Sequence, residues 1–198
     1  MSHDRALQHE PSGLMKYLWS TDHKVIALQY LFTGMAMGAI GGFTVYVFRM
    51  QLAFPGDSVP LYGRVSASAY NALVTSHGTI MVFWVAMPVL LATFGNLLIP
   101  LLIGCDDMAF PRLNRLSFQV FFLSAVVLVA SFFVPGGAFG GAWTAYPPLS
   151  ASGAYNQSPI GATMWLLAVA LEFMAFRLGG INFITTTIQL RAKGLTFM

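Results

Sequence analysis

Four long apolar segments follow one another along the chain, separated by shorter stretches that contain most of the polar residues. They run from about residue 25 to 48, 70 to 103, 116 to 134 and 160 to 190. A helix that crosses a membrane needs roughly 20 mostly apolar residues. The segments do not alternate apolar and polar residues, as the strands of a membrane barrel would. The pattern predicts an all-α, polytopic transmembrane bundle of about four helices, preceded by a polar, cytoplasmic segment over residues 1–24.

Two of these segments have internal features that bear on their shape. The second segment is long and contains Pro88 and Pro100, which predicts a tilt or a kink. The first segment carries Gly34, Gly38 and Gly42 at a spacing of four. Small residues at this spacing let two helix backbones approach closely, so we expect these glycines to share one packing face.

Composition supports a membrane protein and narrows its function. The 198 residues are 57% hydrophobic and 9% charged, with a mean hydropathy of +0.69, whereas soluble domains carry about 25% charged residues. The net charge of +3 comes from scattered Lys and Arg residues, which does not indicate nucleic-acid binding. The single cysteine, Cys105, excludes a disulfide or a multi-cysteine metal cluster within this chain. The expected environment is a lipid membrane.

Positive charge predicts the orientation, because loops rich in Lys and Arg stay on the cytoplasmic side. One side of the predicted bundle holds the two termini and the loop between the second and third segments. The other side carries only Arg49 and Arg64, and Arg177 falls inside the fourth segment. Both termini are therefore expected on the cytoplasmic or matrix side. The positive residues of that side are Arg5, Lys16, Lys24, Arg112, Arg115, Arg191 and Lys193.

Two ionisable residues are expected within the outer part of the bilayer. His77 lies about seven residues into the second segment, and Arg49 ends the first at a similar depth. Ionisable groups at such depth are costly and usually face the protein interior. From the residues alone, His77 is a hydrogen-bonded packing residue, a haem or metal ligand, or a proton relay. Arg49 by itself is typical of a cation whose head reaches the interface.

Two carboxylates, Asp106 and Asp107, begin the loop between the second and third segments. They are either solvated loop acids or the mouth of a polar track into the bundle. Four polar residues on neighbouring segments could continue such a track: Asn96, Asn114, Ser117 and Asn182.

Six motifs are similar to those of a known family: "STDHK", "YNALVTSHGTIMVFWVAMP", "FGNLLIPLLIG", "DMAFPRLNRLSF", "WTAYPPLS" and "INFITT". The stretch from Ser20 to about Ser150 closely resembles subunit I of haem–copper cytochrome oxidases, of the cytochrome c oxidase type. The likeness is weaker over Ser152 to Leu178. The resemblance implies the N-terminal third of a larger subunit of about twelve helices.

The resemblance implies a haem site at the outer end of the bundle. In the family, the histidine of "VTSHGTIM" is an axial ligand of the low-spin haem, expected to be haem a. His77 matches that ligand, and its partner would lie on a helix outside this chain. Arg49 matches an arginine that contacts a substituent at the haem edge. Trp143 matches a tryptophan of the outer loop that packs near the haems.

The resemblance also implies a proton pathway at the inner end. Asp107 matches the carboxylate at the mouth of the family's D pathway. Polar residues that line this pathway in the family match Asn96, Asn114, Ser117 and Asn182.

The chain departs from the family pattern in two respects. No histidine follows His77, so the ligands of the haem–copper binuclear centre must come from residues outside this chain. In the fourth segment, Ala175 and Phe176 replace two serines of the family's D pathway. Apolar side chains cannot hold the ordered water that conducts protons there, which puts a working pathway in doubt. Glu172 and Arg177 also appear there. They either pair with a neighbouring subunit or reflect a locally frameshifted sequence.

The resemblance implies part of a terminal oxidase in a bacterial plasma membrane or a mitochondrial inner membrane. Electrons from cytochrome c would pass through the low-spin haem to an oxygen-reducing haem–copper centre, coupled to proton pumping. Activity requires the remaining helices of subunit I, and the expected partners are the copper-containing subunit II and subunit III. Two alternatives are a quinol oxidase subunit and a haem-free scaffold. Quinol oxidation is disfavoured because polar quinol-binding residues of such relatives correspond here to Ile40, Thr44, Ala69 and Ala72.

Overall fold

The fold is a bundle of long helices, as predicted. A computed structural model describes residues 17–151 and 158–195. Within these ranges four helices are long and apolar enough to cross a membrane: His23–Ala53, Ala67–Ile103, Pro111–Phe133 and Pro159–Gln189. The described residues form no strand beyond an isolated bridge between Val59 and Gly63. The all-α transmembrane fold class is confirmed.

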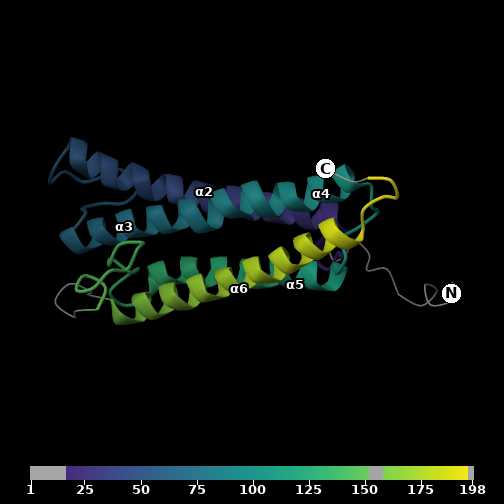
Figure 1. The fold of residues 1–198 in the computed structure, drawn as a ribbon. Helices are drawn as coiled ribbons and strands as arrows, with labels where there is room; N and C mark the ends of the chain where they lie inside the picture. Colours follow the sequence, from purple (N-terminus) through teal and green to yellow (C-terminus); the bar gives the residue numbers. More distant parts are fainter. Residues whose placement is uncertain (1–16, 152–157, 196–198) are drawn as a thin grey trace.

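The helices form two adjacent pairs (Figure 1). Helix α2 (His23–Ala53) lies beside the second crossing, which begins with α3 (Ala67–Thr79) and ends with α4 (Phe94–Ile103). Helix α5 (Pro111–Ala130), which continues into the short 3-10 helix η3 (Ser131–Phe133), packs along α6 (Pro159–Gln189). Helix α2 begins and α6 ends at the same end of the bundle. Arg5 and Lys16, used in the orientation argument, lie outside the described residues.

Helix ends extend beyond the apolar segments because polar residues can cap them. The Asp22 side chain accepts hydrogen bonds from the backbone N–H groups of Lys24 and Val25, at 2.8 and 3.2 Å. These bonds satisfy two of the free donors at the start of α2. Pro111 and Pro159 each occupy the first position of a helix, where a missing N–H costs nothing. Helix α5 therefore begins before its apolar segment does.

The second crossing is irregular around Pro88. Two π-helical stretches, η1 (Ile80–Ala86) and η2 (Pro88–Thr93), connect α3 to α4. Proline lacks the N–H that a regular helix needs, and the wider turns of a π-helix are one response to such an interruption. The second proline, Pro100, lies inside α4.

The glycine face of α2 differs from the expectation in one position. A Cβ atom on Gly34 would lie 2.8 Å from Val89 Cγ2, and one on Gly38 would lie 3.7 Å from Val85 Cγ2. A Cβ on Gly42 would meet nothing within 4 Å, so its predicted place on this face is wrong. Gly41 takes that place, 3.1 Å from Ile80 Cγ2 by the same measure. A step of four residues drifts about 40° around a helix, which moves Gly42 off the face.

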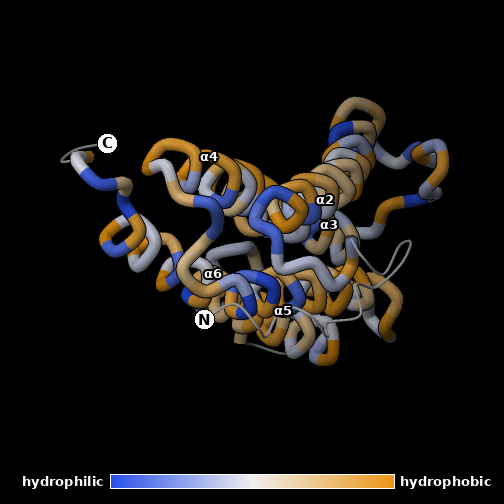
Figure 2. The backbone as a smooth tube through the Cα atoms, turned by 90° about the vertical axis from the view of Figure 1, so that its right-hand side faces the viewer, coloured by the Kyte–Doolittle hydropathy of each residue, from blue (hydrophilic) through white to orange (hydrophobic). Residues whose placement is uncertain are grey.

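Apolar residues predominate along the helices of the bundle, as Figure 2 shows. The core between the helices includes Ile26, Tyr30, Trp84, Phe121 and Trp165. Large apolar side chains also remain exposed on the outside, among them Phe32, Met35, Leu90, Leu166 and Ile184. Exposed apolar surface of this extent is suited to lipid or to further helices.

Candidate functional site

His77 is held in the half of the bundle opposite the start of α2 by a hydrogen bond between two helices. It lies in the last turn of α3, and its Nδ1 atom is 3.0 Å from the Gly41 backbone oxygen. A carbonyl oxygen only accepts, so Nδ1 must carry the proton and donate it. The other ring nitrogen, Nε2, then keeps its lone pair. Metal-bound histidines almost always donate their second ring N–H in this manner, so the local chemistry of His77 fits an iron ligand.

Two aromatic residues pack around the His77 turn. The Phe48 ring on α2 lies edge-on to the imidazole, with 5.7 Å between ring centroids. Trp143, from the loop after α5, covers the residue next to His77, since a Cβ on Gly78 would lie 3.0 Å from Trp143 Cδ1. The neighbouring Ala142 N–H donates to Thr75 Oγ1 at 3.0 Å, which fixes the loop on α3.

Arg49 shares this end of the bundle with His77 but makes no recorded contact with it among the described residues. It follows Phe48 on α2, and its side chain is exposed. It lies eight residues beyond Gly41, or about 12 Å further along the helix axis. The structure therefore brings Trp143 against the His77 turn, and leaves the Arg49 side chain free at the edge of the same region.

At the end of the bundle where α2 begins, the structure distinguishes the two neighbouring aspartates. Asp106 is exposed, whereas Asp107 is half-buried and its Oδ1 accepts a hydrogen bond of 2.7 Å from the Met108 N–H. Burial raises the pKa of Asp107 above its ordinary value, although the Met108 bond and the nearby His23 act in the opposite direction.

Helix α6 fixes the loop that carries Asp107. Asn182 Oδ1 accepts from the Phe110 N–H at 2.9 Å, and Thr186 Oγ1 accepts from the Ala109 N–H at 2.9 Å. Asn182, a predicted member of the polar track, therefore positions the loop. Its Nδ2 atom is buried and has no hydrogen-bond partner among the described residues.

Three of the predicted polar residues meet in the interior between α4 and α5. The Asn114 Nδ2 atom donates to Asn96 Oδ1 at 2.6 Å, and Ser117 Oγ donates to the Asn114 carbonyl at 2.6 Å. The Tyr30 hydroxyl, from α2, donates to Ser117 Oγ at 3.0 Å. Sequence reasoning missed Tyr30, because the same segment also carries Gln29, Thr33, Thr44 and Tyr46 and nothing in the sequence singles it out. All of these side chains are buried.

Glu172 faces the inside of the bundle. One interpretation of the sequence was that it pairs with a neighbouring subunit instead. The side chain is 0% exposed, while Arg177 on the same helix is exposed. Ser124 Oγ lies 3.2 Å from Glu172 Oε2 and 2.5 Å from the Phe121 carbonyl oxygen, two acceptors for its one proton. It accepts from the Trp84 Nε1–H at 3.0 Å. Glu172 is thus enclosed by this chain, which corrects the expectation of an intersubunit pair for this residue.

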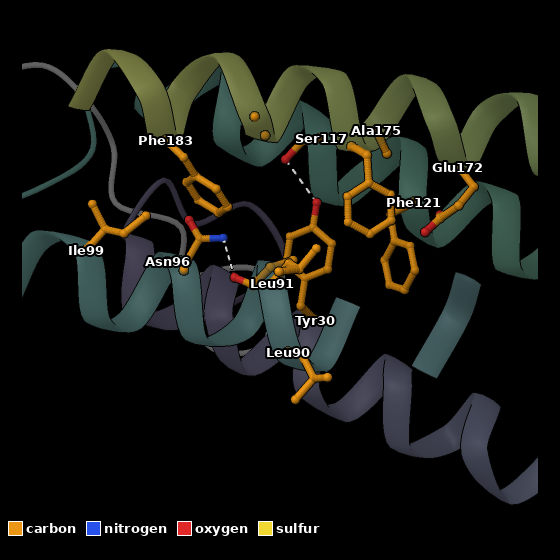
Figure 3. Close-up of a pocket in the computed structure, with 15 residues that line it drawn as sticks. Tyr30, Leu90, Leu91, Asn96, Ile99, Ser117, Phe121, Glu172, Ala175 and Phe183 are labelled. Atoms are coloured by element: carbon orange, nitrogen blue, oxygen red, sulfur yellow. Dashed lines mark hydrogen bonds between the residues drawn. The ribbon is translucent and has the colours of Figure 1, made fainter. Parts of the chain in front are cut away.

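A cavity is lined both by Glu172 and by polar residues nearer the Asp107 end of the bundle. It has a volume of about 330 Å³ and lies among α2, α4, α5 and α6. Figure 3 shows Asn96 towards one end, the hydrogen-bonded Tyr30 and Ser117 in the middle, and Glu172 towards the other end. Apolar wall residues include Leu91, Phe121, Ala175, Phe176 and Phe183.

Comparison with known proteins assigns the chain to a family. The family model described as "Cytochrome C and Quinol oxidase polypeptide I" matches residues 25–198. The chain belongs to this family. Within this oxidase family, it is similar to the "Alternative cytochrome c oxidase subunit 1" of Bradyrhizobium diazoefficiens, with 38% identity over 98% of the chain and 32% of the relative.

Two further relatives have similar names. The "Probable cytochrome c oxidase subunit 1-beta" of Nocardia farcinica is 41% identical over 96% of the chain and 31% of its own length. The "Probable cytochrome c oxidase subunit 1-alpha" of Streptomyces avermitilis is 40% identical over 92% of the chain and 30% of its own length. The chain therefore spans about a third of the length of these relatives. Its described residues bring no three His, Cys, Asp or Glu side chains together as a metal cluster.

Proposed function

We propose that the chain is the N-terminal part of the catalytic subunit of a respiratory oxidase, in which His77 ligates a low-spin haem. The observation that carries the proposal is the hydrogen bond from His77 Nδ1 to the Gly41 carbonyl, which leaves Nε2 available for iron. A haem bound there would supply one-electron transfer. The resemblance to cytochrome c oxidases favours haem a, and the second axial ligand would come from the remaining helices of subunit I.

The residues around His77 would orient and polarise the haem site. Phe48 and the Thr75-anchored loop restrict rotation of the imidazole and of the turn that carries it. Arg49, with an exposed guanidinium at the same end, would contact a substituent at the haem edge and favour the reduced iron by its charge. Trp143 would cover the haem from the outer loop.

At the inner end, Asp107 would collect protons for the D pathway. A partly exposed carboxylate at the mouth of a polar track raises the local proton concentration. The convergence of Asn96, Asn114 and Ser117 supports a continuous route, because their polar groups can hold ordered water. Asn182 would keep the mouth of the route in place through the loop.

The electron donor in this proposal is cytochrome c, acting through a copper-containing subunit II, with subunit III as a further partner. The four positions considered for quinol all line one cavity of about 650 Å³: Ile40, Thr44, Ala69 and Ala72. Three of them are apolar, and the Thr44 hydroxyl already donates to the Gly41 carbonyl at 2.7 Å. These four positions therefore offer little for the polar headgroup of a quinol.

The donor is tested by oxygen consumption of the purified, assembled complex. We expect turnover with reduced cytochrome c and none above background with a short-chain quinol, each monitored with an oxygen electrode. A spectrum of the dithionite-reduced complex should show the low-spin haem. Rapid oxidation of quinol would assign the complex to the quinol oxidases, and a complex without haem would favour the scaffold alternative.

The orientation is tested by labelling Cys105 in the loop that carries Asp107. With the termini and this loop on the cytoplasmic or matrix side, a membrane-impermeant maleimide should modify Cys105 in inside-out vesicles and not in right-side-out vesicles. Burial raises the pKa of the Cys105 thiol, so labelling at neutral pH should be slower than for an exposed thiol and should accelerate as pH rises. Mass spectrometry of the Cys105 peptide measures both effects. Labelling in right-side-out vesicles would reverse the orientation.

A further inference from the structure

We propose that Glu172 is a proton-holding site within the membrane, joined by water in the cavity to the polar residues above Asp107. This inference rests on the proposed oxidase function and adds a specific residue to its proton route. A proton arriving on a cavity water would form an O–H bond at Glu172 Oε1. When the proton leaves towards the outer half of the bundle, that bond breaks and the carboxylate is restored.

The first argument is the incomplete bonding of the Glu172 carboxyl. The side chain is fully buried, and Oε2 lies 3.2 Å from the Ser124 hydroxyl, whose single proton it must share with the Phe121 carbonyl oxygen at 2.5 Å. The second oxygen, Oε1, is buried without a hydrogen-bond partner among the described residues. Buried polar atoms are almost always paired with protein or ordered water. A carboxyl with a purely structural role would have both oxygens occupied, whereas this one leaves an oxygen for water in the cavity it lines.

The second argument is the continuity of the cavity. Its volume of about 330 Å³ is far more than one water requires, which is about 30 Å³ in the liquid. A water also needs polar partners. The walls of the cavity are mostly apolar, and its polar groups belong to Asn96, Ser117 and Tyr30 on the inner side and to Glu172 on the other (Figure 3). Glu172 lies ten residues before Asn182 on α6, or about 15 Å closer to the outer face.

The third argument explains how a route can exist although the serines of the family are missing. Glu172, Ala175, Gly179 and Asn182 are all buried and lie on one stripe of α6. Between the two polar ends of this stripe the side chains are small. A Cβ on Gly179 would find only Ser117 Oγ at 4.0 Å, and one on Gly180 would find nothing within 4 Å. The space left by these glycines can hold water, and the longer Glu172 side chain supplies the polar group that Ala175 and Phe176 lack.

Among the described residues, Glu172 has the uncharged Ser124 beside it and no cation within ion-pair distance. Arg177 is exposed and belongs to a different face of α6. A carboxylate enclosed without a cation is costly, and proton binding from cavity water removes that charge. The same enclosure separates Glu172 from bulk solvent, so exchange of its proton depends on the water in the cavity.

The test uses redox-induced infrared difference spectroscopy on the assembled oxidase. We expect the wild type to show a carbonyl stretch of a neutral carboxylic acid that shifts in D₂O. Glu172→Gln, which has nearly the same shape, should remove this band and slow proton uptake during turnover about tenfold or more. Glu172→Asp should retain a band and recover part of the rate. Asp106→Asn, at the exposed loop carboxylate, is the matched control and should change neither.

The possible results separate this inference from the proposed function. A normal low-spin haem spectrum with an unchanged carboxyl band and unchanged uptake in Glu172→Gln overturns the inference and leaves the oxidase assignment intact. Absence of haem from the wild-type complex overturns both. If Glu172→Gln fails to assemble, Glu172→Asp decides: a band displaced from the wild-type position supports the proposal, and a band identical to wild type contradicts it.

Discussion

Replacing His77 by alanine is expected to abolish the low-spin haem signal of the assembled oxidase and to reduce oxygen consumption to background. The reason is local: the Gly41 carbonyl holds Nδ1, so Nε2 is the atom that remains for iron. Alanine removes that nitrogen, so a haem bound there would lose the ligand that this chain supplies. The measurement is the reduced-minus-oxidised optical spectrum, together with oxygen uptake.

His23 provides a matched control for this experiment. It is also buried, and its Nδ1 atom faces a backbone carbonyl, Asn96 O, at 2.8 Å. It begins α2 at the opposite end of the bundle, so His23→Ala should keep the low-spin signal whatever it does to turnover. His77→Gly with added imidazole should restore part of the signal, which separates loss of a ligand from failure to assemble. A normal low-spin spectrum in His77→Ala would refute the assignment.

Asp107→Asn should slow turnover and proton pumping about tenfold or more. A negative charge at the mouth of a cleft raises the rate at which positive ions arrive by about this factor, and asparagine lacks that charge. Asparagine preserves the shape and can still accept from the Met108 N–H, which holds the carboxylate at 2.7 Å. It removes only the charge and the titratable proton. Oxygen consumption and proton release by the oxidase in sealed vesicles measure the two effects.

The dependence on pH gives this prediction a second test. The Asp107 carboxylate is charged above its pKa and loses its advantage as pH falls through that value. Because burial raises the pKa of Asp107, the difference between wild type and Asp107→Asn should shrink at a higher pH than for an ordinary aspartate. Asp106→Asn, at the exposed neighbour, should leave the rates nearly unchanged at every pH. Near-normal activity in both variants would make Asp107 an ordinary loop carboxylate.

The sequence alone determined the class of the protein and the candidate residues at its two ends. In lipid the backbone polar groups must be bonded within a helix or a closed barrel. The four apolar segments are long enough for helices and lack the alternation of barrel strands, so the sequence indicates a helix bundle. The motifs around His77 and Asp107 were long enough to indicate the family, which the family model supports over residues 25–198. The motif that begins at Asp107 also selected this residue over Asp106 as the candidate, and the structure shows that Asp107 is the more buried of the two.

Only the tertiary structure decided which way the side chains of each helix face. In a soluble protein the polar face of a helix is visible in the sequence, but a membrane helix is apolar on the lipid side as well as the protein side, so its rotation is hidden. The sequence therefore could not place Glu172 inside the bundle, recognise Tyr30 as the partner of Ser117, or choose Gly41 over Gly42. Those choices follow from packing between helices far apart in sequence, and they determine which polar atoms meet in the cavity.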